Sequence, residues 1–155
     1  MRLQVTSTLP CSAARLSAEL GRPALFLHIT ARLLVFQPVD PPTVAAVWAP
    51  GVYRFRLLVG GRVPLGEHTV DARQVGVTDP AVAAPQQVWH DAGYSALIKS
   101  WDHKIILEPG GSTRYTDQVE IYAGLLTVPA WLFAHLFYRH RQRKLAAVVA
   151  ADFDY

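Results

Sequence analysis

The sequence predicts an α+β fold, in which a curved antiparallel β-sheet is covered by a long C-terminal helix. Several strand-like runs follow one another without helices between them, which favours an antiparallel sheet over a βαβ arrangement. Two short helical segments come before most of these runs, and an apolar segment with helical spacing, Gly124 to Ala150, lies near the C-terminal end. The 155 residues suit one hydrophobic core, so we expect residues 1–155 to form a single domain.

The N-terminal part of the chain predicts a strand, two short helices and a second strand. Apolar and polar residues alternate from Arg2 to Leu9, as in a half-buried strand. Ser12 is placed to cap a short helix that ends near Gly21, and Pro23 suits the first turn of the next helix. The chain is β-rich again from Arg32 to Val39.

Residues 52–59, VYRFRLLV, alternate strictly. Tyr53, Phe55 and Leu57 fall on one face and two arginines on the other, which predicts a half-buried antiparallel strand. We expect further strands around residues 68–75, 86–94, 97–109 and 112–122, and a loop over residues 78–85.

This order of elements resembles the START-like, or SRPBCC, superfamily, which includes Bet v 1-like proteins, polyketide cyclase/dehydratases and lipid-transfer domains. The stretches that carry the resemblance are WDHKIILEP (101–109), TRYTDQVEIYAG (113–124) and FYRHRQRK (137–144), and they resemble a bacterial branch of that group. The resemblance implies a helix-grip fold of about seven strands, with two short helices after the first strand and a long helix over the concave face. It also implies a cavity between the sheet and that helix.

The C-terminal segment has three interpretations: a membrane span, a membrane-surface helix and a helix that closes the core. Residues 121–138 lack Asp, Glu, Lys and Arg, and a basic cluster follows them. However, the preceding strand takes the first residues of this run, Pro129 and His135 interrupt the rest, and the sheet needs a cover. We therefore expect a core helix that begins near Val128, with Pro129 in its first turn.

Helical spacing predicts which side chains of this segment face the sheet. They are Leu126, Phe133, Leu136, Phe137 and Val148. Another flank carries Trp131, His135, Tyr138 and Gln142. This flank either packs on neighbouring strands or loops, or it forms an exposed contact. The exposed contact would be with a membrane surface or, through Trp131, His135 and Tyr138, with a second copy of the chain in a homodimer. The basic run from Arg139 to Lys144 is expected to be a solvated helix face, or else a site for anionic lipid headgroups or an acidic partner.

The last two strands can be paired on paper. If opposed residue numbers sum to 222, Trp101 faces Ile121, His103 faces Val119 and Leu107 faces Tyr115, so apolar residues meet across the hairpin. The same register opposes the like charges of Asp102 and Glu120, which counts against it.

This register places His103 and Asp117 on the inner face as diagonal neighbours within hydrogen-bond reach. An aspartate beside a histidine fixes the tautomer of the ring and raises its basicity, as in a general base. The pair has three interpretations: a self-satisfied pair in a core, a ligand-orienting pair and a catalytic pair.

The leading functional hypothesis is a domain that binds a hydrophobic small molecule or lipid between the sheet and the last helix. The candidate cavity residues are Tyr53, Phe55, Leu57, Trp101, His103, Ile105, Tyr115, Asp117, Phe133 and Phe137. The alternatives are a cyclase or dehydratase that uses His103 and Asp117, and a protein- or membrane-interaction module that uses the C-terminal helix.

Composition and motifs argue against several other classes. The single cysteine, Cys11, cannot form an internal disulfide, and no signal peptide is recognisable, so we expect a cytoplasmic protein. The net charge of +3 comes with no nucleic-acid-binding signature, so no nucleic-acid partner is expected. The histidines lack metal-ligand spacing and no nucleotide-binding loop is present, so we expect neither a metal site nor a cofactor.

Overall fold

The computed structural model describes residues 1–75 and 84–155. In chain order the elements are β1 (Arg2–Leu9), α1 (Ala13–Leu20), α2 (Pro23–Thr30), β2 (Leu34–Asp40), β3 (Gly51–Val59), β4 (Val63–Val75), β5 (Gln86–Ser95), β6 (Ser100–Glu108), β7 (Thr113–Tyr122), the 3-10 turn η1 (Gly124–Leu126) and α3 (Thr127–Ala150). Most of the loop expected over residues 78–85 lies outside the described residues.

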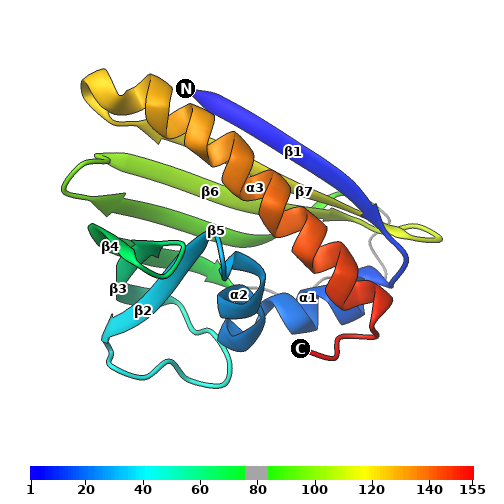
Figure 1. The fold of residues 1–155 in the computed structure, drawn as a ribbon. Helices are drawn as coiled ribbons and strands as arrows, with labels where there is room; N and C mark the ends of the chain where they lie inside the picture. Colours follow the sequence, from blue (N-terminus) through cyan, green and yellow to red (C-terminus); the bar gives the residue numbers. More distant parts are fainter. Residues whose placement is uncertain (76–83) are drawn as a thin grey trace.

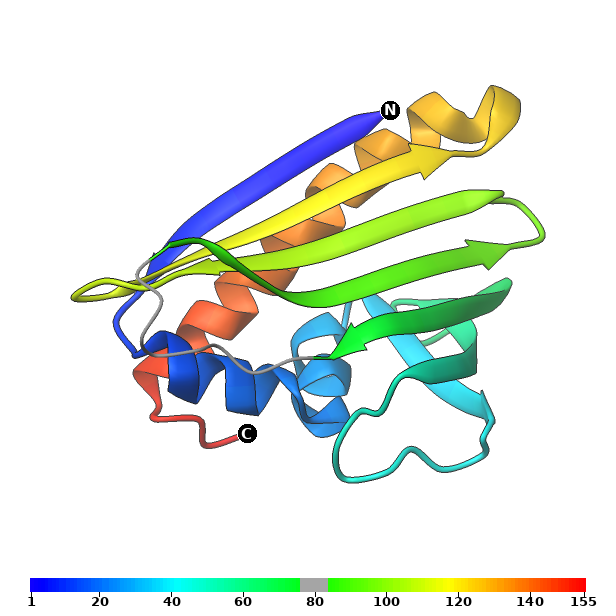
Figure 2. The same ribbon diagram turned by 180° about the vertical axis from the view of Figure 1, so that it is seen from behind.

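The strands form a seven-stranded sheet in the order β1-β7-β6-β5-β4-β3-β2, and each neighbouring pair is antiparallel. The sheet is curved, and α3 runs diagonally across its concave face, with α1 and α2 beside the C-terminal half of α3 (Figure 1). Seen from behind, the convex face of the sheet is turned to the viewer, and α3 lies on its far side (Figure 2). The predicted helix-grip architecture is confirmed.

Local sequence signals set the helix starts as expected. Ser12 caps α1, since its hydroxyl oxygen accepts from the Arg15 N–H at 3.2 Å. Pro23 occupies the first turn of α2, where its missing N–H costs no hydrogen bond. Pro129 lies in the first turn of α3, and the Thr127 hydroxyl bonds both Ala123 N, at 2.9 Å, and Gly124 O, at 2.8 Å.

The β6–β7 hairpin has the predicted register. Trp101 opposes Ile121, His103 opposes Val119 and Leu107 opposes Tyr115. The like-charged pair that counted against this register is also present, because Asp102 opposes Glu120. Asp102 has partners instead on its own side of the sheet: the ring of His90, with Nε2 at 2.9 Å, and the ammonium of Lys104, with Nζ at 3.6 Å.

The predicted inward face of α3 is partly wrong. Phe137 and Val148 are buried and Phe133 is half-buried, but Leu126 and Leu136 are 45% and 65% exposed. The buried stripe is instead made of Ala134, Phe137, Tyr138, Arg141, Gln142, Leu145, Val148 and Val149. It keeps the helical spacing but includes three polar residues, each of which bonds a side chain on the sheet: Tyr138, Arg141 and Gln142.

Two further expectations for α3 need correction: the second flank is not one surface, and the basic run from Arg139 to Lys144 is not wholly solvated, because Arg141 is buried. Tyr138 and Gln142 are buried, so they cannot belong to a surface shared with Trp131 and His135. Trp131 is half-buried and donates its indole N–H to the Arg2 carbonyl at 2.9 Å. In the described parts of the chain, no helix combines the length and hydropathy that a membrane crossing requires.

Candidate functional site

A cavity with mainly apolar walls lies between the concave face of the sheet and the N-terminal half of α3. It contains about 700 Å³ of space that no atom fills, part of it open to solvent. Its apolar wall includes Phe36, Leu57, Ile98, Trp101, Phe133 and Phe137. Its polar side chains are few, as is usual for sites that bind hydrophobic ligands.

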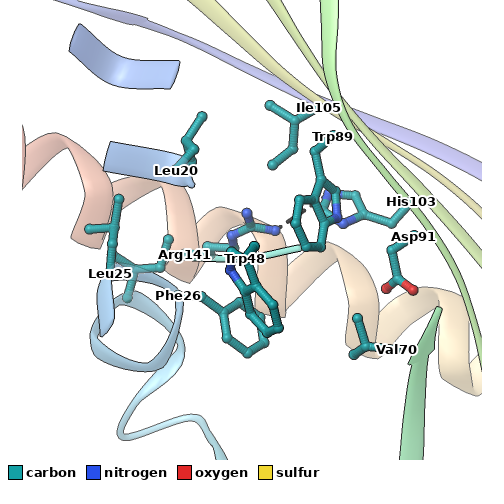
Figure 3. Close-up of a pocket in the computed structure, with 11 residues that line it drawn as sticks. Leu20, Leu25, Phe26, Trp48, Val70, Trp89, Asp91, His103, Ile105 and Arg141 are labelled. Carbon is teal, nitrogen blue, oxygen red and sulfur yellow. Dashed lines mark hydrogen bonds between the residues drawn. The ribbon is translucent and has the colours of Figure 1, made fainter. Parts of the chain in front are cut away.

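A second, smaller cavity adjoins the first beneath α2 and is lined by Leu25, Trp48 and Trp89 among others. The two cavities share Asp91, His103 and Arg141 as lining residues. Figure 3 shows these three side chains reaching into the smaller cavity from β5, β6 and α3. The two cavities therefore adjoin one another at one group of ionisable side chains.

The most densely bonded of the polar groups is centred on Asp117, which has no solvent exposure. Its Oδ1 lies 2.8 Å from His103 Nε2, accepts from the Tyr115 hydroxyl at 2.8 Å and lies 3.3 Å from Arg141 Nη1. Its Oδ2 accepts from Gln142 Nε2 at 3.0 Å. We call these five residues the Asp117 cluster; they join β6, β7 and α3.

The charges within the Asp117 cluster follow from burial and pairing. Burial alone would raise the pKa of Asp117, but the charge of Arg141 and the hydrogen bond from His103 outweigh burial and hold the pKa below its usual value. Burial lowers the pKa of Arg141, yet the charge of Asp117 outweighs this and the net shift is upward. The ion pair of the cluster is therefore Arg141 with Asp117.

His103 is the neutral member of the cluster. Burial lowers the pKa of His103 and outweighs the hydrogen bond to Asp117, which acts in the opposite direction. A neutral ring beside an ionised carboxylate must carry its proton on the nitrogen that faces it, so Nε2 donates to Asp117. Nδ1 is then the acceptor nitrogen of the ring.

Arg141 has a donor that the cluster does not use. Its side chain is buried, and its Nε has no hydrogen-bond partner within the described residues. Nη1 faces Asp117 and lies 3.4 Å from His103 Nε2. Because Arg141 lines both cavities, this guanidinium is the cationic group of the site.

Asp91 is a second buried carboxylate on the cavity wall. Its Oδ1 accepts from the Asp71 backbone N–H at 2.9 Å. Burial raises the pKa of Asp91 to about 7, and the carboxylates of Asp71 and Asp102 act in the same direction. Near neutral pH this group therefore exchanges a proton readily.

His68 completes the polar part of the wall, and Gly93 makes room for it. A Cβ at Gly93 would lie 2.8 Å from both His68 Nε2 and the Thr69 carbonyl oxygen, so only glycine allows this close approach. Burial lowers the pKa of His68 to about 4, so its ring is neutral at physiological pH.

The structure distributes the predicted cavity residues between two positions. Those that line a cavity are Leu57, Trp101, His103, Ile105, Phe133 and Phe137. The other four, Tyr53, Phe55, Tyr115 and Asp117, are not among the described lining residues of either cavity. Phe55 is a core residue, half-buried Tyr53 packs on Trp48, and Tyr115 and Asp117 belong to the Asp117 cluster behind the wall.

Sequence reasoning missed His68, Asp91, Arg141 and Gln142 as parts of the site. Arg141 and Gln142 follow Tyr138 by three and four positions, which is a helical signal for a common face. Asp91 opposes His103 across β5 and β6, so it belongs to a strand beyond the hairpin that the sequence could pair. Among the described residues, no group of three or more His, Cys, Asp and Glu side chains could hold a metal ion.

Several solved structures resemble this chain over nearly its full length. A START superfamily protein from Mycobacterium smegmatis has a TM-score of 0.61 at 12% identity, with 97% of each chain covered. The AHSA1 protein from Silicibacter pomeroyi has a TM-score of 0.65 at 18% identity, with 98% of this chain and 99% of that chain covered. Ara h 8.0201, a Bet v 1-like protein, has a TM-score of 0.61 at 13% identity, with 97% and 98% covered. No protein-family model and no curated protein matches the sequence.

Proposed function

We propose that this chain, which has the START-like helix-grip fold, binds a hydrophobic small molecule or lipid in the cavity between its sheet and α3. The observation that carries the proposal is the mainly apolar cavity, with a few ionisable groups at one place on its wall. A well-packed interior would instead fill such a space with side chains.

The driving force would be the removal of apolar ligand surface from water. This contributes roughly 25 cal/mol per Å² before the costs of ordering the ligand and side chains are subtracted. Aromatic residues such as Trp101 and Phe137 provide broad contact surfaces for it. The polar groups at the junction of the two cavities would orient one end of the ligand.

A blocking substitution on α3 tests the proposal. Ala130 lines the larger cavity, so Ala130→Phe places a ring in the ligand space without removing a core side chain. Ala147→Phe is the matched control, because Ala147 is exposed on the same helix. The probe is Nile red, a neutral apolar dye, followed by its fluorescence on titration with protein.

We expect the wild type and Ala147→Phe to bind Nile red alike, and Ala130→Phe to bind at least about tenfold more weakly. Equal binding by Ala130→Phe and the wild type would place the dye elsewhere and contradict the proposal, as would no binding by the wild type. Native mass spectrometry of the purified protein would then identify any molecule that is retained from the cell.

The enzyme alternative has weaker support in the geometry. The lowered pKa of buried His103 makes it a poor proton acceptor near neutral pH, and the charge of Asp117 is engaged by Arg141. These features suit a positioning role for the pair better than a general base.

A further inference from the structure

We propose that the ligand is an apolar carboxylic acid whose carboxylate binds the Nε side of Arg141 at the junction of the two cavities. This inference rests on the proposed binding function and specifies its ligand class. The observation behind it is the buried Nε–H of Arg141, which has no partner among residues 1–75 and 84–155.

A buried guanidinium donor without an acceptor is unfavourable, because folding removes its water and returns no hydrogen bond. Arg141 is only 4% exposed, and the Asp117 cluster engages it through Nη1, on the other side of the group. The N–H of Nε and the adjacent N–H of Nη2 form the edge that binds carboxylates in bidentate fashion. A ligand carboxylate at this edge would satisfy Nε without displacing Asp117.

The charge balance at the junction also favours an anion. Asp117 already receives neutral donors from His103, Tyr115 and Gln142, so its negative charge does not depend on Arg141 alone. The contact with Asp117 is made through Nη1, so the donor at Nε is left for an anion. A cationic ligand would be repelled by the guanidinium, and a hydrocarbon would leave Nε unpaired.

The other ionisable groups of the junction do not repel an anion below neutral pH. His68 and His103 are neutral because burial lowers the pKa of each. Asp91, whose pKa burial raises to about 7, is protonated below that pH and can donate a hydrogen bond. Asp71 and Asp102, the two carboxylates that act on Asp91, are not among the described lining residues of either cavity.

The position of Arg141 suits an amphipathic acid rather than a small polar anion. Apolar residues line both cavities that meet at Arg141, including Phe26, Val70 and Trp101 on their walls. The hydrocarbon part would occupy the larger cavity, with its carboxylate toward Arg141 on α3.

Three compounds with the same ten-carbon chain test the choice of head group: decanoic acid, decan-1-ol and decylamine. Each is titrated against protein-bound Nile red at about pH 6, where Asp91 is mostly protonated. We expect the acid to displace the dye at a concentration about tenfold lower than the alcohol, and the amine to be weakest.

A double variant assigns the preference to Arg141. Arg141→Met alone would leave Asp117 buried without its counter-ion, whereas Arg141→Met with Asp117→Asn removes both charges together. In the double variant we expect the ratio of acid to alcohol affinity to fall to about one. Arg141→Lys keeps a positive charge but lacks the Nε edge, and we expect it to lose most of the acid preference.

The outcomes separate this inference from the proposed function. If the alcohol displaces the dye as well as the acid does, the cavity binds apolar ligands but the acid assignment is wrong. An acid preference that survives in the double variant would equally overturn the role of Arg141. If none of the three compounds displaces the dye, both the binding function and its ligand class fail.

Discussion

The concave face of the sheet carries two buried carboxylates, Asp117 on β7 and Asp91 on β5, and their charge states differ. Their exposed fractions are 0% and 6%, so burial raises the pKa of both. Four side chains on three elements bond Asp117 and keep it ionised. Asp91 accepts one hydrogen bond, from a backbone N–H, and lies near two other carboxylates. Burial and these two negative charges raise its pKa to about 7.

The difference shows that the number and charge of the partners, rather than the depth of burial, decide whether an inward-facing carboxylate is ionised. The two groups also have separate tasks in the proposed site. The Asp117 cluster holds Arg141 through an ion pair, whereas Asp91 can change protonation at the cavity wall. The substitutions below test this comparison.

The largest expected effect comes from Asp117→Asn. It removes the counter-ion of Arg141 and leaves a buried, unpaired charge, so we expect a loss of about 3–5 kcal/mol in the free energy of unfolding at pH 7. Urea denaturation measures it. Asp102→Asn is the matched control, because Asp102 also pairs with a histidine but is 35% exposed, and we expect a change below about 1 kcal/mol. Similar losses in the two variants would contradict the importance of burial and pairing.

The sequence predicts the β6–β7 hairpin and one bond of the Asp117 cluster well. Strict alternation in both strands leaves one register in which apolar residues meet, and that register brings His103 within 2.8 Å of Asp117. Period-two patterns are sensitive to register, since a slip of one residue turns each side chain to the other face. This is why even an unfavourable pair such as Asp102 and Glu120 did not mislead the assignment.

The remainder of the site could not be found from hydrophobicity. Hydrophobicity predicts that Leu136 faces the sheet and that Arg141 faces solvent. In the structure Leu136 is exposed and Arg141 is buried, because Arg141 pairs with the Asp117 carboxylate. The place of Asp91 is hidden by register shifts in β5, between Gln87 and Trp89, and in the facing strand β4. Partners from distant strands, which no local pattern contains, decide these positions.

The next largest effect is a pH-dependent one, at Asp91. The folded state binds a proton at Asp91 up to about pH 7, whereas the unfolded chain releases it near the ordinary value of 3.8. The wild type therefore loses stability at this site as the pH rises from about 4 to about 7. Asp91→Asn removes this pH-dependent loss of stability, and its amide oxygen can still accept the hydrogen bond from the Asp71 N–H.

We expect the wild type and Asp91→Asn to be equally stable near pH 4 and the variant to be more stable by about 2–3 kcal/mol at pH 8. A shift of about three units converts to about 4 kcal/mol, and water entering beside the ionised group reduces that. Urea denaturation at several pH values measures the difference. A constant difference across the range would show that Asp91 does not titrate as described.

The smallest expected effect concerns the basic run on α3, where identical residues two positions apart have different surroundings. Arg141 is buried in the Asp117 cluster, whereas Arg139 and Arg143 are exposed. An exposed charge is screened by water and salt, so it should contribute little to the ionisation of Asp117. We expect Arg143→Ala to change the free energy of unfolding by less than about 0.5 kcal/mol.

The same variant should leave the pKa of Asp117 below its usual value, as followed by NMR titration of its carboxyl carbon. Arg139→Ala repeats the test one turn nearer the larger cavity, with the same expectation. A loss of stability comparable with that of Asp117→Asn, or a marked rise in the pKa of Asp117, would mean that the whole basic run sustains the buried carboxylate. The contrast between Asp117 and Asp91 would then reflect the field of the helix surface rather than direct contact with Arg141.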